Sequence, residues 1–290
     1  MNFIRKSKWA VTLAAVVIGA SMLAAGCGGG SAKKEEPKKA EAVEGTVTAS
    51  GSTALLPLLK AGQEEFQKNN PKATVNIAGG GSFTGQNQVA AGSVNIGNSD
   101  VALQDSLKDK GLVEFKLVGI PFVFIANKSV GVDNLTMQQY VDIFSGKITN
   151  WKDVGGKDEK ITIIHRPTSS GSRATIQQVV MKEAKFSDNA VIQDSNGAVR
   201  AGIASTPGAI GYVDAAYVDD SIKALSVDGA KYSLDNVQSG KYKILTVGRM
   251  FTKGQPTGAV KAFLDYVTGD AFQNAQAEKQ GFVPLTKMPK

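Results

Sequence analysis

The sequence predicts an α/β protein whose two lobes enclose a cleft, and two observations indicate this fold. From Thr46 onward, short apolar segments typical of strands alternate with helical patterns, as in a parallel or mixed sheet covered by helices. Two longer apolar stretches, 115–127 and 242–251, have the length of strands that run from one lobe to the other. If the chain crosses over and returns in this way, the second lobe is an insertion in the first.

The elements that precede the first crossover follow in a regular order. Residues 53–68 predict a helix, because their leucines and Phe66 fall on one side and Pro57 lies in the first turn, where proline is tolerated. The glycine-rich segment 79–82 leads into a second helix that runs through Val89. Short strands are expected before and after these helices, at 46–50, 73–77 and 95–97.

Composition and charge allow a globular protein with one large or two small domains. The chain has 290 residues, of which 42% are apolar and 20% charged, enough apolar material for a sizeable core. Its net charge is +7, but three basic residues lie in the first ten positions, and without them 30 basic residues face 26 acidic ones. A small excess without a basic stripe suits the attraction of small anions and argues against nucleic acid as a partner.

Residues 1–26 follow the plan of a secretory signal peptide. A positive start is followed by the apolar run 9–20, and the small residues before Cys27 resemble a lipobox, the cleavage site of bacterial lipoproteins. The leucine that this motif favours falls one place early, at Leu23. We therefore expect Cys27 to carry a lipid, the alternatives being a signal anchor or an ordinary cleaved signal.

Residues 27–44 are predicted to form a flexible tether, since they contain almost no large apolar side chains. A lipid at Cys27 would hold the protein at the membrane surface, in the periplasm or on the outer face of the cell, depending on the envelope. No later apolar run is long enough to span a bilayer. Cys27 is also the only cysteine, so an internal disulfide is excluded.

Three loops combine helix starts with glycine and hydroxyl residues, and each is a candidate anion site. They lie at 50–54, 79–82 and 166–173. The first turn of a helix presents free backbone N–H groups and the positive end of the helix dipole. For the first loop the alternative is an ordinary helix cap by Thr53, and for the second it is a flexible glycine turn.

The third loop, 166–173, contains the most side chains that could bind an anion. It follows an expected strand at 161–164, leads into a helix that extends to Met181, and contains Arg166 and Arg173. Arginine offers a planar fork that matches a tetrahedral oxyanion, although surface arginines beside a capped helix would give the same pattern. The neighbouring His165 is the only histidine, which excludes a multi-histidine metal site. Because the chain has no Gly-x-Ser-x-Gly motif, we interpret it as structural rather than as a catalytic base.

Three segments of the chain resemble a known family. The most specific is 135–156, which contains the run Ile-Phe-Ser-Gly-Lys-Ile-Thr-Asn-Trp-Lys-Asp-Val-Gly-Gly, and the others are 207–212 and 281–285. All three are similar to segments of the phosphate-specific substrate-binding proteins of ABC importers, and the resemblance covers residues 45–290. It implies a type II periplasmic-binding fold, in which two α/β lobes are joined by two hinge strands and phosphate is buried in the cleft.

The resemblance also assigns the lobes and the ligand residues. Asp100 matches the family aspartate that accepts a proton from phosphate, although its sequence context alone would equally suit a helix cap. In some members of the family an acidic residue occupies the position of Thr168. This difference leaves open which groups hold the Arg166 side chain in place, but it does not affect the assignment of the site. The lobes are expected at 45–122 with 250–290 for lobe I, and at 123–249 for lobe II. The positions that match the phosphate ligands are Thr53, Ala54, Ser82, Asp100, Arg166, Ser170, Gly171 and Ser172.

The resulting prediction is a binding protein without catalysis, a monomer that captures inorganic phosphate outside the cytoplasm and hands it to the membrane permease subunits of an ABC importer. We expect neither a cofactor nor a metal ion. Three alternatives stay open: a binding protein for another oxyanion such as sulfate or molybdate, a secreted phosphatase or esterase, and a surface adhesin on the same fold. Asp100 distinguishes phosphate from the ligands of the first alternative, because a fully ionised oxyanion has no proton to share with this carboxylate. The lack of a multi-histidine cluster counts against the enzyme.

Overall fold

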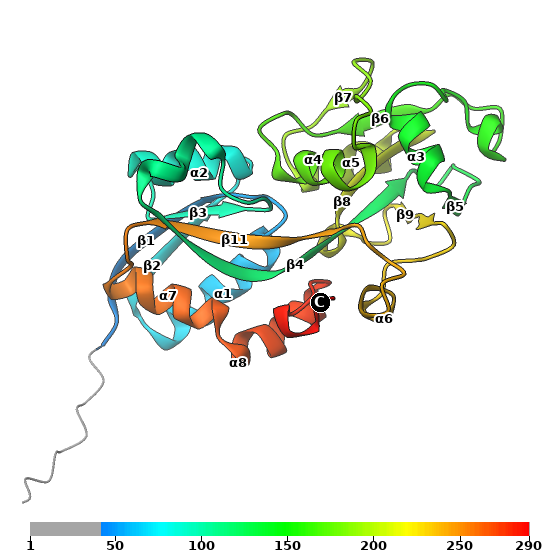
Figure 1. Ribbon diagram of the computed structural model, residues 1–290. Coiled ribbons are helices and arrows are strands. Elements are labelled where there is room, and N and C mark those ends of the chain that lie inside the picture. The colour runs from blue at the N-terminus through cyan, green and yellow to red at the C-terminus, as the bar shows by residue number, and fades with distance from the viewer. Residues whose placement is uncertain (1–41, 290) are drawn as a thin grey trace, which may run out of the picture. The chain divides into compact units, whose positions relative to one another are not determined.

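The computed structural model describes residues 42–289, in which helices and strands alternate as the sequence predicts (Figure 1). The predicted signal peptide, Cys27 and the tether up to residue 41 lie outside the described residues. The strands are β1 (Glu44–Gly51), β2 (Lys72–Ala78), β3 (Ile96–Ser99), β4 (Leu112–Ala126), β5 (Asn134–Leu135), β6 (Thr162–His165), β7 (Val191–Ile192), β8 (Ala209–Asp214), β9 (Lys223–Ala224), β10 (Ser226–Val227) and β11 (Leu245–Lys253). The helices are α1 (Leu56–Asn69), α2 (Ser82–Ala91), α3 (Met137–Phe144), α4 (Gly171–Ile176), α5 (Asn196–Ser205), α6 (Leu234–Gln238), α7 (Gly258–Thr268) and α8 (Asp270–Phe272).

One mixed sheet connects the two halves of the described chain. Its strand order is β2-β1-β3-β11-β4-β8-β6-β7, and β9 pairs with β4. Strand β4 is shared, because its residues 112–121 pair with β11 and its residues 122–126 pair with β8. β4 and β11 run antiparallel to each other along the connection (Figure 1). This arrangement confirms the predicted type II periplasmic-binding fold, two α/β lobes joined by two hinge strands.

Both hinge strands lie within three residues of the predicted stretches. The segment just before β11 does not continue the strand. It is hydrogen-bonded instead to Phe122, the residue at which the pairing partner of β4 changes from β11 to β8. The Tyr242 hydroxyl donates to the Phe122 carbonyl at 2.6 Å, and the Phe122 N–H donates to the Ile244 carbonyl at 2.8 Å. The lobe boundaries at 122/123 and 249/250 stay a prediction.

Helices cover both faces of the sheet in lobe I (Figure 1). α2 lies on one face of β1 and β3, and α1 and α7 lie together on the opposite face. Helix α1 buries Leu58, Leu59 and Phe66, and the Phe66 ring meets that of Phe263 in α7 edge-on, with 5.3 Å between centroids. Burial of one such side chain contributes on the order of 1.5–3 kcal/mol, so this apolar side fixes α1 against the sheet.

The start of α1 differs from the prediction. The helix begins at Leu56, and its N-cap is Leu55, which makes no side-chain cap. Instead, the Ser52 hydroxyl oxygen accepts a hydrogen bond from the Leu55 N–H at 3.2 Å. The suggested capping role of Thr53 is therefore wrong. The chain bends over residues 53–55, and the Thr53 hydroxyl meets lobe II instead.

Lobe II has a small core of its own and a second one shared with the rest of the chain. Helix α5 packs on β4, β6 and β8 through residues that include Ile164 and Val199. In the family-like segment 135–156, Trp151 is buried and its indole N–H donates to the Gly208 carbonyl at 2.9 Å. Gly208 belongs to another of the family-like segments, so two of the three motifs that carry the resemblance pack against each other.

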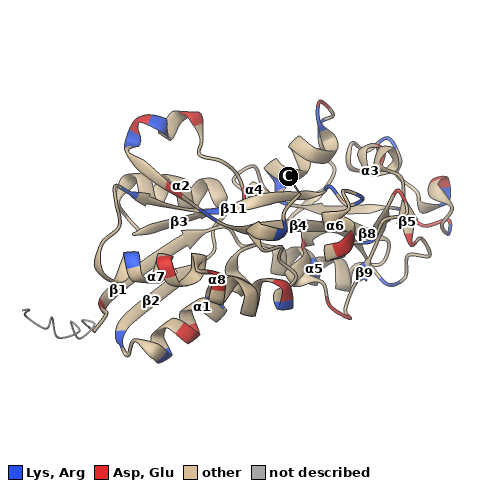
Figure 2. Cartoon of the chain, turned by 60° about the horizontal axis from the view of Figure 1, so that its bottom comes forward, with Lys and Arg blue, Asp and Glu red and all other residues tan. Residues whose placement is uncertain are grey.

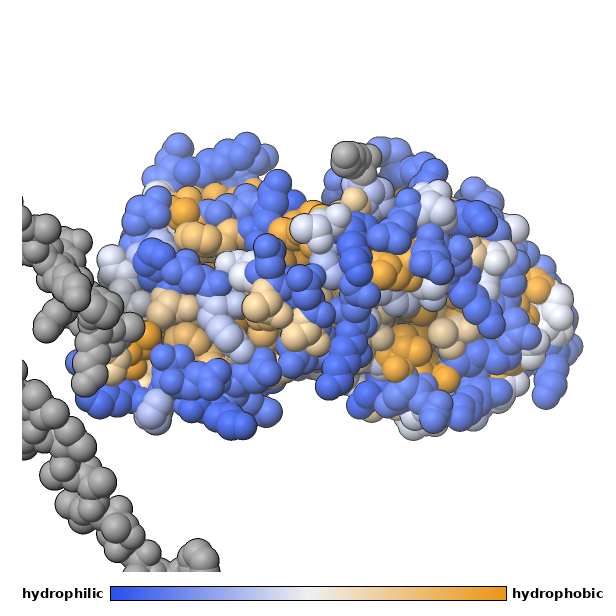
Figure 3. Space-filling model, turned by 90° about the horizontal axis from the view of Figure 1, so that it is seen from below, coloured by the Kyte–Doolittle hydropathy of each residue, from blue (hydrophilic) through white to orange (hydrophobic). Residues whose placement is uncertain are grey.

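The surface of the described part is mixed in character. Figure 2 shows lysine and arginine interspersed with aspartate and glutamate, and Figure 3 shows hydrophobic residues in separate areas between hydrophilic ones. Within residues 42–289 the exposed large hydrophobic residues are Val191, Ile192 and Leu285. In the same range, no helix has the length and apolar character needed to cross a membrane, and no group of histidine, cysteine and acidic residues is suited to a metal ion.

Candidate anion site

The predicted ligand residues meet at one edge of the sheet. Strands β1, β2 and β3 are parallel, so the loops 50–54 and 79–82 and the residue Asp100, which follow them, come together at their carboxyl ends. From lobe II, the loop 166–173 joins β6 to α4 and contacts these segments. All eight predicted residues are buried here: Thr53, Ala54, Ser82, Asp100, Arg166, Ser170, Gly171 and Ser172.

The Asp100 carboxylate is held by hydroxyl groups from both lobes. Ser172 Oγ donates to Oδ2 at 2.9 Å, and Ser52 Oγ donates to Oδ1. The Asp100 N–H donates to Ser82 Oγ at 2.9 Å, which fixes the backbone of the aspartate as well. A carboxylate has about four lone-pair positions, so two hydroxyl donors leave room for a further O–H group. The alternative interpretation of Asp100 as a helix cap is wrong, since its side chain bonds to these serines.

Burial raises the pKa of Asp100 above its ordinary value. The hydrogen bonds from Ser52 and Ser172, and then the charge of Arg166, oppose this rise because they favour the ionised form. On balance the pKa of Asp100 stays raised, because the loss of water around the carboxylate outweighs these favourable contacts.

The Arg166 guanidinium is buried, and three of its nitrogens are directed by hydrogen bonds. Nε donates to the Gln193 carbonyl at 3.1 Å, and Nη2 donates to the Asp194 carbonyl at 2.7 Å. Nη1 points across to lobe I and donates to Thr53 Oγ1 at 3.2 Å. Burial lowers the pKa of Arg166, and the neighbouring Asp100 opposes this shift. Two backbone carbonyls of lobe II thus hold the guanidinium, and Thr168 makes none of its hydrogen bonds.

The start of α4 brings lobe II into direct contact with lobe I. Ser170 caps the helix by accepting a hydrogen bond from the Arg173 N–H at 3.3 Å. The next residue, Gly171, lies so close to Ser82 that an added Cβ would stand 2.1 Å from its Oγ. Only glycine allows this approach, so Gly171 sets how closely the two loops can meet.

Arg173 and His165 support the third loop through contacts with the Arg166 carbonyl. Arg173 Nη1 donates to the Arg166 carbonyl at 2.9 Å, and its guanidinium lies 4.7 Å from the centre of the Phe186 ring. His165 Nδ1 lies 3.0 Å from the same Arg166 carbonyl, and burial lowers the pKa of His165. Nδ1 lies near this carbonyl and near Arg173 Nη1, and Nε2 has no hydrogen-bond partner within the described chain, so neither ring nitrogen is paired with a serine.

Three residues of the cluster were missed by the sequence analysis. Ser52 lies within the first loop and could have been included with its neighbour. Asn196 starts α5 and bonds to Thr53, and the polar run before that helix resembles the other helix starts. Tyr217 donates its hydroxyl to the Thr53 carbonyl at 2.6 Å, and nothing in its sequence context indicates this contact.

A second buried carboxyl group lies beside the site. Asp214, at the end of β8, accepts a hydrogen bond from the Ala216 N–H at 2.9 Å through Oδ1. Its Oδ2 has no hydrogen-bond partner within the described chain. Burial raises the pKa of Asp214 well above its usual range, although the Ala216 N–H opposes the shift; Asp100 adds to it. Asp214 therefore holds its proton to a higher pH than an ordinary aspartate does.

Replacing Asp214 by asparagine should stabilise the protein, and more so as the pH rises. Below the unfolded-state pKa near 3.8, both states hold the proton. Above it only the unfolded chain ionises, so wild-type stability is lost as the pH rises toward the raised folded-state pKa, by roughly 1.4 kcal/mol per pH unit. Urea unfolding of both proteins between about pH 4 and about pH 8 measures this. A difference that does not change with pH would contradict the raised pKa of Asp214.

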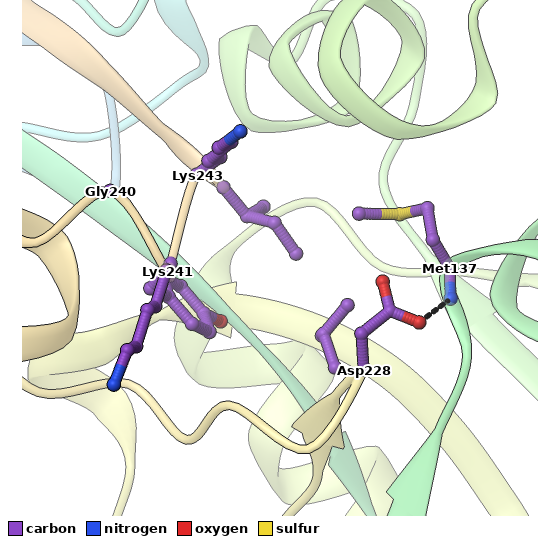
Figure 4. A pocket seen from close by; sticks show the side chains of 8 residues that line it. Met137, Asp228, Gly240, Lys241 and Lys243 are labelled. Carbon is purple, nitrogen blue, oxygen red and sulfur yellow. Dashed lines mark hydrogen bonds between the residues drawn. The ribbon is translucent and has the colours of Figure 1, made fainter.

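A separate cavity of about 240 Å³ lies beside the segment that leads into β11 (Figure 4). The Asp228 carboxylate lies at its wall and accepts a hydrogen bond from the Met137 N–H at 3.1 Å. Lys241 and Lys243 also line the cavity, and their ammonium ends point away from it in Figure 4. None of the eight predicted ligand residues lines this cavity, so it is distinct from the anion site.

Comparisons with known proteins agree with this fold. A family model described as a PBP superfamily domain matches residues 36–271. The phosphate-binding protein PstS of Bacillus subtilis is 40% identical over 274 residues, which cover 92% of this chain and 91% of that protein. PstS of Borreliella burgdorferi is 29% identical over 83% of this chain and 91% of its own length. The chain therefore belongs to the PBP superfamily and, within it, to the PstS family.

Solved structures give the same result. A substrate-binding protein with bound phosphate from Clostridium perfringens superposes with a TM-score of 0.79 at 32% identity, covering 82% of this chain and 99% of that one. An ABC-type phosphate transport receptor from Vibrio cholerae has a TM-score of 0.66 at 25% identity, with the same coverage. The resemblance drawn from the three sequence motifs is confirmed.

Proposed function

We propose that the protein captures inorganic phosphate outside the cytoplasm and delivers it to the permease subunits of an ABC importer. One observation carries the proposal: Arg166 and Asp100, a buried cation and a buried carboxyl group, lie near enough for each to favour the charged form of the other, and each is held by a hydrogen bond across the lobes, Arg166 to Thr53 and Asp100 to Ser172. The fork of Arg166 suits the oxygens of a tetrahedral anion, and the carboxylate suits an O–H group. Phosphate near neutral pH offers both. The names of the relatives support the same ligand.

The proposed ligands divide between the two lobes. Lobe I contributes Thr53, Ala54, Ser82 and Asp100, and lobe II contributes Arg166 and the start of α4 with Ser170, Gly171 and Ser172. An anion held from both sides favours the closed arrangement, because only that arrangement makes all the contacts.

The hydrogen bonds within the site favour a binding protein without catalytic activity. The serines of the cluster are bonded to Asp100 and to backbone N–H groups, and none of their hydrogen bonds goes to His165. The relatives named above are binding proteins. Sulfate and molybdate are the next candidates as ligands, and Asp100 disfavours both, since neither carries a proton near neutral pH.

Calorimetry of the folded part from residue 45 onward tests the ligand directly. Phosphate should bind with one site per chain, arsenate should compete with it, and sulfate should bind far more weakly. Tight sulfate binding with no phosphate binding would overturn the proposal. Hydrolysis of a chromogenic phosphate ester by the same sample would show a catalytic activity instead.

We also propose that the protein is a monomer held at the membrane by lipid on Cys27. The exposed large hydrophobic residues of the described part are confined to Val191, Ile192 and Leu285, which is little material for an obligate dimer interface. The anchor rests on the lipobox-like run that ends at Cys27.

Replacing Cys27 by alanine should release the protein from the membrane fraction. The thiol of Cys27 is the only one in the chain, so no other residue can take the lipid by a thioether. Fractionation and immunoblotting compare the two proteins, with Ser31→Ala in the tether as a control that stays at the membrane. An equal distribution of wild type and Cys27→Ala would rule out the anchor.

A further inference from the structure

Thr53 Oγ1 is the point on which hydrogen-bond donors of lobe II converge. Asn196 Nδ2 lies 3.0 Å from this oxygen, Arg166 Nη1 lies at 3.2 Å and the Asn196 N–H at 3.3 Å. Asn196 is 0% exposed and is separated from Thr53 by 143 positions in the chain. Both residues are buried, so water does not compete for these bonds.

The orientation of the Asn196 amide is set by the backbone of β8. Its Oδ1 accepts a hydrogen bond from the Asp214 N–H at 3.1 Å. Because an N–H group can only donate, the amide oxygen must face Asp214 and the amide nitrogen must face Thr53. The side chain of Ser195 accepts a hydrogen bond from the Ala198 N–H at 3.1 Å and holds the start of α5 in place.

These contacts determine what the Thr53 hydroxyl can do. A hydroxyl group has one proton to donate and two lone pairs that accept. The amide nitrogen of Asn196, the guanidinium of Arg166 and the Asn196 N–H are donors only, so these three groups share the two lone pairs and leave neither free. The proton of Thr53 is then directed to another partner, which must be an acceptor. Tyr217 holds the carbonyl of the same residue, so the backbone of Thr53 is fixed too.

We infer that Asn196 is a positioning residue of the anion site, which keeps the Thr53 hydroxyl as an obligate donor to the bound anion. The inference rests on the proposed function, because it is the anion that accepts the proton. Asn196 does not need to touch the ligand for this role. It acts through Thr53, and that dependence can be measured.

A double-mutant cycle with phosphate calorimetry tests the dependence. Asn196→Ala should weaken phosphate binding roughly ten-fold, the effect of one buried hydrogen bond, when Thr53 is present. In the Thr53→Val background, where the hydroxyl is gone, the same substitution should change affinity less than about three-fold. In the Thr53→Ser background, which keeps a hydroxyl, the roughly ten-fold effect should return.

Two controls make the cycle decisive. Asn236→Ala removes an asparagine side chain that donates to the Lys231 carbonyl outside the site, and it should leave phosphate affinity unchanged in every background. If Asn196→Ala does not fold, Asn196→Ser replaces it, because its side chain is too short to reach Thr53 but still polar. Circular dichroism and thermal unfolding check that each variant is folded.

The outcomes separate the inference from the proposed function. If wild type does not bind phosphate, the proposed function fails and the inference falls with it. If wild type binds, but the substitution at Asn196 has the same effect with and without the Thr53 hydroxyl, the inference alone is overturned. An unchanged affinity of the folded Asn196 variant in the wild-type background would overturn it as well.

Discussion

Replacing Arg166 by alanine should weaken phosphate binding by tens-fold to thousands-fold. The guanidinium is buried, and two of its nitrogens are held by backbone carbonyls of its own lobe, so its orientation does not depend on contacts across the lobes. Loss of one partner of a buried, charge-assisted hydrogen bond costs on the order of 2–5 kcal/mol. Titration calorimetry measures the loss directly.

Two further variants show which property of Arg166 matters. Arg166→Lys keeps the charge but has no planar fork, and it cannot satisfy the Gln193 and Asp194 carbonyls in the same way, so its affinity should lie between those of wild type and Arg166→Ala. Arg200→Ala removes an arginine whose partner is Asp219 on the surface of lobe II, and it should bind phosphate as wild type does. Near-native affinity of Arg166→Ala would remove this residue from the site.

Wild type should discriminate between phosphate and sulfate by roughly 10⁴–10⁵ in affinity, and Asp100 should be the cause. Phosphate near neutral pH has an O–H group that the carboxylate can accept, whereas sulfate has none. Facing sulfate, an ionised Asp100 would be desolvated next to a like charge. Arsenate keeps both the proton and nearly the same shape, so it should compete far better than sulfate.

Asp100→Asn should reduce this discrimination, because an amide can donate to sulfate. The pH dependence gives a second test. Burial raises the pKa of Asp100, so on acidification the carboxyl group gains a proton earlier than an ordinary aspartate does and can then donate to sulfate. Sulfate affinity of wild type should therefore rise on acidification, and that of Asp100→Asn should change little. Asp235→Asn, which removes an exposed carboxylate from α6, is the matched control. A phosphate-to-sulfate ratio that is equal in wild type and Asp100→Asn would exclude Asp100 as the discriminator.

The fold could be predicted because the sequence contains specific family-like segments, but most of these segments lie outside the ligand cluster. The run around Trp151 is the most specific part of the resemblance, and in the structure it builds the core of lobe II and contacts Gly208. The segment at 281–285 pairs with the hinge, since the Val283 N–H donates to the Gly119 carbonyl at 2.9 Å.

The candidate site was harder to predict, because its residues are small, polar and common. Thr53, Ser82 and Ser172 acquire meaning only when parallel strands and the crossover of β4 bring their loops together. The contact of Asn196 with Thr53 spans 143 positions, and no local pattern can indicate it. Asp214 looks like an ordinary turn residue at the end of a strand, and only its complete burial shows that its pKa is raised well above the usual range.

The order of the strands also constrains how the chain can fold. β11 lies between β3 and β4 in the sheet, yet it is formed by residues 245–253, which follow lobe II in the chain. Until these residues are available, β3 and β4 each have an unpaired edge, and such edges associate readily with other chains. The part of lobe I that is synthesised first is therefore completed by one of the last segments to be made. A chain that stops before β11 would retain the contiguous elements β6, α5 and β8 of lobe II but leave the sheet of lobe I open.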